Sequence, residues 1–153
     1  MAALHLLRET PAAPPAVWEA LTDFAAYGSW MPLTRMRLDP GPPRVGWGFA
    51  GHSGIGRLSF RDSMLVTAWS PPVGADAGTF RVVKTGWLLG GWAEVTVRPS
   101  EHGTRVVWDE ELSVRPLPFP RLFASGLRRV GQWLYGRALD AMLAEAVRRG
   151  QRR

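Results

Sequence analysis

Three ionisable residues stand out because the predicted strands would place them among aromatic and aliphatic side chains. They are Asp62, Lys84 and Glu110, and Lys84 is the only lysine among 19 basic residues. A buried charge has to be paired or neutralised. Such a trio could orient the polar end of an apolar ligand, or supply acid and base for a cyclisation or dehydration. The alternative is an ordinary cross-strand ion pair between Asp62 and Lys84 that reaches water.

The other chemistry-bearing patterns predict no catalytic residue, no cofactor and no metal site. Residues 46–51 fit G-x-G-x-x-G, but a dinucleotide-binding fingerprint ends a strand and opens a helix. This segment instead lies inside a predicted strand that precedes a hairpin. His5, His52 and His102 are scattered without the spacing of metal ligands, and the chain has no cysteine.

The length and amino-acid composition of the chain restrict the class of protein that it can be. With 153 residues, of which 46% are hydrophobic and 21% charged, we expect one folded globular domain covering residues 1–153. No apolar run approaches the roughly 20 residues of a membrane span, and the N-terminus lacks a basic-then-apolar signal pattern. We therefore expect a cytoplasmic protein.

The net charge of +6 comes almost entirely from arginine, which indicates the codon bias of a GC-rich bacterial genome. No specific nucleic-acid partner is expected from it. The exception is the C-terminal tail, where Arg148, Arg149, Arg152 and Arg153 cluster. These cations complement a helix dipole, although weak contact with an anionic membrane or RNA is an alternative.

A long helix is predicted over residues 119–149, after the proline-rich run 116–120, which is a connection or else an apolar lid. Its length would be about 40 Å. Apolar residues recur there at helical spacing: Phe123, Leu127, Val130, Leu134, Ala138, Leu139, Ala141 and Met142. Such a stripe needs a large apolar partner, and Gly126, Gly131 and Gly136 on the helix would leave room beside it.

The partner surface is a set of alternating segments that read as strands. They cover residues 3–10, 34–38, 44–51, 58–69, 79–85, 91–98 and 104–114. Between the first two, Pro14 and Pro15 favour a short helix, and Asp23 would cap a second one.

Turn positions then predict which strand residues face one another. Turns near Gly54, Val73 and Ser100 would pair Phe49 with Phe60, Phe80 with Val66, Lys84 with Asp62, and Val95 with Val106. Paired residues share a sheet face, so one face collects aromatic and aliphatic residues, with Val45 and Trp47 among them. Trp69 and Val83 fall on the opposite face. We predict a one-sided antiparallel sheet.

The order of elements and several residues resemble the START-like, or SRPBCC, superfamily, the polyketide cyclase, dehydrase and lipid-transport group. The matching residues are the segment 17–23, Trp30-Met31-Pro32, Val45-Gly46, Pro71-Pro72, and the segment 103–106 with Trp108. The resemblance implies an α+β helix-grip fold: a seven-stranded curved antiparallel sheet wrapped around the long C-terminal helix, with two short helices between strands 1 and 2. It also implies an apolar cavity. Members bind sterols, lipids, quinones, hormones or polyketides, and only some are enzymes.

The sequence thus predicts a small hydrophobic molecule as partner, held between sheet and helix. The predicted ligand-binding residues are Trp30, Trp47, Phe49, Phe60, Asp62, Met64, Phe80, Val82, Lys84, Val95, Trp108, Glu110, Leu127 and Leu134. A carrier or binding protein is the first hypothesis. A polyketide cyclase, aromatase or dehydratase is the second, and a membrane- or RNA-interaction module using the basic tail is the third.

Overall fold

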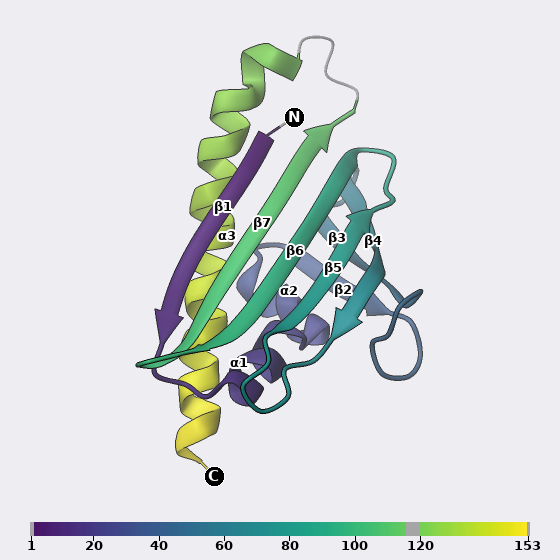
Figure 1. The fold of residues 1–153 in the computed structure, drawn as a ribbon. Coiled ribbons are helices and arrows are strands. Elements are labelled where there is room, and N and C mark those ends of the chain that lie inside the picture. The colour runs from purple at the N-terminus through teal and green to yellow at the C-terminus, as the bar shows by residue number, and fades with distance from the viewer. Residues whose placement is uncertain (1, 116–119, 153) are drawn as a thin grey trace.

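The computed structural model describes residues 2–115 and 120–152. A seven-stranded antiparallel sheet and a long C-terminal helix dominate it, which confirms the predicted helix-grip architecture (Figure 1). In chain order the elements are β1 (Ala2–Thr10), α1 (Pro14–Leu21), a 3-10 turn η1 (Phe24–Ala26), α2 (Tyr27–Trp30), β2 (Thr34–Leu38), β3 (Gly48–Ile55), β4 (Leu58–Ser70), β5 (Gly78–Lys84), β6 (Leu89–Ser100), β7 (Gly103–Val114) and α3 (Pro120–Gln151).

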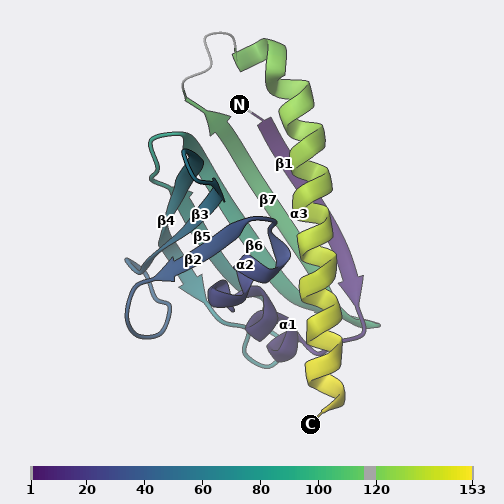
Figure 2. The same cartoon turned by 180° about the vertical axis from the view of Figure 1, so that it is seen from behind.

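The sheet order is β1-β7-β6-β5-β4-β3-β2, so the first strand of the chain lies at one edge and the second at the other. Consecutive strands from β2 to β7 are neighbours, and β1 pairs with β7. All three helices lie on one side of the sheet, and α3 runs along its length beside β1 (Figure 2). One face of the sheet is therefore covered by helices, and the other is open to solvent.

The predicted hairpin registers were wrong, but the predicted faces were mostly right. In the β3–β4 pair Phe49 lies opposite Met64 rather than Phe60, because the turn is at residues 56–57 and not near Gly54. In the β6–β7 pair Val95 lies opposite Trp108 rather than Val106. In both pairs the true partner lies an even number of residues from the predicted one. Side chains alternate between the two sheet faces with a period of two, so an even shift does not change the face. The same residues therefore stay on the inner face.

A β-bulge in β4 reverses one predicted orientation. The pairing with β5 shifts between Val66 and Ala68, so Trp69 lies opposite Phe80. The extra residue turns the Trp69 ring inward, where it packs edge-on against Trp18 at 5.2 Å between ring centroids. The prediction that Trp69 faces outward was wrong for this reason.

The strand predicted over residues 44–51 also begins later than expected. Trp47 donates its backbone N–H to the Arg44 carbonyl, and Gly46 has a φ of +86°, so this stretch is a turn. Val45 is consequently 61% exposed rather than part of the inner face. Trp47 remains buried, and its indole N–H donates to the Asp39 carbonyl at 3.1 Å.

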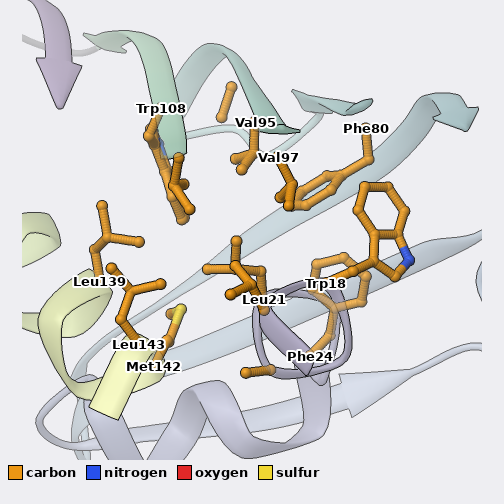
Figure 3. Close-up of a cluster of buried hydrophobic side chains, with 14 of the residues drawn as sticks. Trp18, Leu21, Phe24, Phe80, Val95, Val97, Trp108, Leu139, Met142 and Leu143 are labelled. Carbon is orange, nitrogen blue, oxygen red and sulfur yellow. The ribbon is translucent and has the colours of Figure 1, made fainter. Parts of the chain in front are cut away.

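The hydrophobic core occupies one end of the space between sheet and helices. It is built from α1 and η1, the C-terminal half of α3 and the middle strands (Figure 3). Leu21, Val95 and Leu139 are fully buried there, and Phe24 stacks on Phe49 with ring centroids 4.3 Å apart. Full burial of each such side chain contributes roughly 1.5–3 kcal/mol. This end is filled by protein alone.

Burial along α3 is uneven, which the predicted stripe did not foresee. Leu139, Met142 and Ala146 are buried, whereas Val130 is 61% exposed and Trp133 is 60% exposed. The side chain of Phe123 and residues 116–119 lie outside the described part of the chain. Residues 125–137 of α3 are thus less covered by the rest of the protein than residues 138–146.

The C-terminal half of α3 is also tied to α1 and η1 by charge. Asp23, predicted to cap the second helix, makes no side-chain capping bond. Its carboxylate instead accepts a hydrogen bond from Arg149 at 2.9 Å, and Arg149 also pairs with Glu145 at 3.1 Å.

Candidate functional site: a cavity with one polar cluster

A cavity of about 290 Å³ lies between the sheet and the N-terminal half of α3. It is close to the lower end of the range of small-molecule sites, about 300–1,000 Å³. Residues of η1, α2, α3 and all strands except β1 line it. Eleven of the predicted ligand-binding residues are among them: Phe49, Phe60, Asp62, Met64, Phe80, Val82, Lys84, Trp108, Glu110, Leu127 and Leu134.

Three predicted residues are not among those that line the cavity. Val95 is fully buried in the core, between Phe80 of β5 and Trp108 of β7 in the sheet. Trp47 packs against Phe24 and Phe49, with its indole N–H already satisfied by Asp39. Trp30 is half-buried beside Tyr27. A residue can therefore be predicted on the inner face of the sheet and still not line the cavity.

Other lining residues were missed by the sequence reasoning. Tyr135 follows Leu134 on α3 and packs against Trp108 with ring centroids 6.0 Å apart. Its spacing of eight from Leu127 could have identified it as a wall residue. Tyr27 and Met31 come from the stretch between β1 and β2, where sequence periodicity gives little signal, and Met36 comes from the edge strand β2.

Of the three glycines on α3 that were expected to leave room, only Gly131 is among the lining residues. A Cβ on Gly131 would lie 3.0 Å from the Leu4 side chain of β1, so its absence also lets α3 approach the sheet closely. Gly136 faces Arg8, and Gly126 has open space around it.

The three predicted ionisable residues meet at one place in the cavity wall. The Lys84 ammonium donates to Asp62 Oδ2 at 2.7 Å and lies 3.8 Å from Glu110 Oε1. Glu110 Oε2 accepts the Trp108 indole N–H at 3.1 Å. The side chains of Lys84, Asp62 and Glu110 are 3%, 13% and 1% exposed, so the alternative of a water-exposed ion pair was wrong.

The pairing of Lys84 with Asp62 differs in detail from the predicted one. Across the strands Lys84 lies opposite Met64, and Asp62 lies opposite Gly51 of β3. The two charged residues are therefore diagonal neighbours, a separation that a long lysine side chain can span. Asp62 and Gly51 both line the cavity.

The cluster shifts the pKa of its members in a consistent way. Burial disfavours the Lys84 ammonium, but the charges of Tyr135 once ionised, Glu110 and Asp62 outweigh it, so the pKa of Lys84 lies above its usual range. Burial raises the pKa of Glu110, and the opposing effects of Lys84 and the Trp108 N–H do not cancel it. Burial likewise raises the pKa of Tyr135, with a further contribution from the charge of Glu110.

These shifts define what the site can do chemically. A lysine held as ammonium is neither a nucleophile nor a base, but it can stabilise an oxyanion. Glu110, whose pKa is raised, could act as an acid, and the Asp62 carboxylate is placed to act as a base. Among the described residues no group of three or more His, Cys, Asp or Glu could hold a metal ion. In that same part of the chain, no helix is long and apolar enough to cross a bilayer.

The raised pKa of Glu110 predicts a pH-dependent effect of Glu110→Gln. Because the folded state binds this proton more tightly than the unfolded state, the stability from neutral Glu110 is fully present below the unfolded pKa. It is lost as pH rises through the folded pKa. The Tm of Glu110→Gln minus that of the wild type should thus increase from mildly acidic to mildly alkaline pH, as measured by thermal melts. The variant keeps an oxygen for Trp108.

The matched control is Glu101→Gln, an exposed carboxylate in the turn between β6 and β7. Its melting curve should follow the wild type across the same pH range. A Tm difference for Glu110→Gln that stays constant or shrinks with rising pH would contradict the prediction.

Comparisons with known proteins agree with this architecture. Residues 1–147 match the family described as polyketide cyclase / dehydrase and lipid transport. No curated protein sequence matches the chain. Among solved structures, the protein TTHA0849 from Thermus thermophilus is similar with a TM-score of 0.72 and 14% identity, covering 95% of this chain and 97% of that one.

Two further similar structures carry the name aromatase/cyclase. The ZhuI aromatase/cyclase from a Streptomyces species has a TM-score of 0.71 at 16% identity, over 96% of this chain and 94% of that one. The di-domain ARO/CYC protein StfQ of the steffimycin biosynthetic pathway has a TM-score of 0.73 at 14% identity, over 97% of this chain and 51% of that one. Identities this low establish a shared fold. Together with the family match over residues 1–147, the sheet, the long helix and the cavity between them show that this chain belongs to the polyketide cyclase / dehydrase and lipid transport family.

Proposed function

We propose that this protein binds a small hydrophobic or amphipathic molecule, such as a lipid, a polyketide or another aromatic metabolite, as a carrier or binding protein. The observation that supports this most is the cavity of about 290 Å³, whose wall is apolar except at a few polar groups. A concave apolar site with a few convergent polar groups is typical of small-molecule binding.

Apolar contacts would provide most of the binding affinity, and polar contacts would orient the ligand. Apolar ligand surface buried against Phe60, Phe80 and Trp108 would contribute about 25 cal/mol per Å². The cluster of Asp62, Lys84 and Glu110 would set the direction in which the ligand lies, since only there does the inner wall carry charge among the described residues.

A second candidate function is a polyketide cyclase, aromatase or dehydratase that uses the same cavity. The specific observation in its favour is that a proton acceptor, an ammonium and a carboxyl with a raised pKa converge inside it. Two similar structures are named aromatase/cyclases. In such a reaction, holding a flexible substrate in one folded shape supplies much of the rate acceleration.

The third candidate, an interaction module that uses the basic tail, gains no comparable support. Arg148 pairs with Glu145 at 2.8 Å, and Arg149 pairs with Asp23 at 2.9 Å. Arg149 therefore connects α3 to the segment between α1 and η1, whereas Arg148 pairs within α3 itself.

Native mass spectrometry of the freshly purified protein tests the binding proposal. The wild type should carry a co-purifying apolar compound that is released on denaturation. Leu134→Trp should reduce the loaded fraction at least about tenfold, because a larger ring would fill the cavity from α3. Gln132→Trp, at an exposed position on the same helix, is the matched control and should load like the wild type.

The same compound separates the two main candidates. A carrier returns it with unchanged mass after incubation, whereas an enzyme converts it, and Asp62→Ala or Lys84→Ala abolishes the conversion. Empty wild-type protein, or equal loading of Leu134→Trp and Gln132→Trp, would count against ligand binding in this cavity.

A further inference from the structure

One oxygen of the polar cluster has no partner. Asp62 Oδ1 is buried and accepts no hydrogen bond from any residue that the structure describes. A buried carboxylate oxygen left in this state costs free energy, on the order of 1–3 kcal/mol or more. Asp62 is one of the residues that line the cavity, so a molecule bound there would lie beside its carboxylate.

Asp62 Oδ1 is the only buried polar side-chain atom of the cluster without a hydrogen-bond partner among the described residues. Lys84 directs its ammonium to Asp62 Oδ2 at 2.7 Å, with Glu110 Oε1 at 3.8 Å and the Met64 sulfur at 4.0 Å. Glu110 Oε2 holds the Trp108 N–H. The group that the cluster still needs is therefore a hydrogen-bond donor, and it needs that donor at Asp62.

The charges of the cluster distinguish among possible donors and acceptors. A carboxylate on the ligand would bring a further negative charge toward Asp62 and Glu110, while the single ammonium is already shared between them. A neutral hydroxyl adds no charge and supplies the missing donor. An ether or ester oxygen adds no charge but cannot donate.

We propose that the cavity selects neutral, largely apolar molecules that carry a hydroxyl group at one end, and that this hydroxyl donates its hydrogen to Asp62 Oδ1. This inference rests on the proposed binding function and names the chemical class of the ligand. Gly51 lies opposite Asp62 in the sheet, with the Thr34 and Met36 side chains of β2 beside it. Phe60, Met64 and Phe80 then surround the apolar remainder.

Three probes that share one ring system test the proposal. They are 2-naphthol, 2-methoxynaphthalene and 2-naphthoate. Each is titrated at neutral pH into the full-length protein by calorimetry, with intrinsic tryptophan fluorescence as a second readout. A hydrogen bond to a charged acceptor makes the naphthol bind on the order of ten- to a hundredfold more tightly than the methoxy compound. The naphthoate should bind at least about tenfold more weakly than the naphthol.

Asp62→Asn is the decisive variant, because its amide can keep an oxygen toward Lys84 while it presents N–H groups in place of Oδ1. The preference for naphthol over methoxynaphthalene should fall to within about threefold. Asp140→Asn, which removes an exposed carboxylate on the outer side of α3, should retain the full preference.

Equal affinities of wild type for naphthol and methoxynaphthalene would overturn the inference and leave the binding function intact. Tightest binding by the naphthoate would do the same. If none of the three compounds binds and no apolar molecule co-purifies, the binding function itself fails. The wild-type series decides the matter even if Asp62→Asn does not fold.

Discussion

Replacing Lys84 by methionine is expected to lower the free energy of unfolding by about 3–5 kcal/mol at neutral pH. The ammonium is 3% exposed and compensates two buried carboxylates, Asp62 at 2.7 Å and Glu110 at 3.8 Å. Methionine fills a similar volume, so the loss isolates the uncompensated charge from a packing defect. Urea unfolding followed by tryptophan fluorescence measures it by linear extrapolation.

The double variant Lys84→Met/Asp62→Leu should recover most of that loss. Replacing both partners of a buried ion pair with apolar residues is often neutral. Arg105→Met is the matched surface control: it removes a pair with Glu9 in which both side chains are about half exposed, and it should cost at most about 1 kcal/mol. A Lys84→Met loss no larger than that of Arg105→Met would show that the ammonium does not stabilise the cluster.

Gly91→Ala is expected to destabilise the protein by about 3–5 kcal/mol for a different reason. Gly91 in β6 has a φ of +119°, and a Cβ there would overlap the carbonyl oxygen of Glu111 on β7. Both strands would have to move apart, and Gly91 is the cross-strand partner of Lys84. The variant should therefore also weaken binding of an apolar probe, measured in the same titration as above.

Gly126→Ala is the opposite case in the same protein. Nothing lies within 4 Å of the position a Cβ would occupy, and the residue is within α3. Alanine should stabilise the helix by roughly 0.5–1 kcal/mol. If both alanine variants changed the unfolding free energy alike, close packing at Gly91 would not be the cause.

The sequence predicted the fold more securely than the pairing of its strands. The resemblance that Trp18, Trp30 and Trp108 helped to support implied the architecture, and period-two alternation assigned the inner face. Turn residues such as Gly54 and Ser100 marked the hairpins, but the turns lie one or two residues further along the chain. The alternation of side chains cannot reveal a register that is wrong by an even number of residues. It also assigns the wrong face after a β-bulge, such as the one that turns Trp69 inward.

The polar cluster was predictable because charged residues on an otherwise apolar face are rare. Lys84, Asp62 and Glu110 met that description from the sequence alone. The limits of the cavity were not predictable, since they depend on where α1 and the C-terminal half of α3 fill the hollow. Val95 and Trp47 are buried in the hydrophobic core, whereas Tyr135 lines the cavity.

The two halves of α3 differ in how firmly they are packed against the rest of the protein. The inward face of the C-terminal half is buried, and Arg149 binds Asp23 near its end. The buried residues of this face are Ala138, Leu139, Met142, Leu143 and Ala146. The stretch that carries Val130 and Trp133 has fewer buried side chains, so its local opening requires less free energy than opening of the core. We therefore expect the part of α3 beside the cavity to open before the rest of the helix, and under the proposed binding function this opening would be the entry route for a ligand.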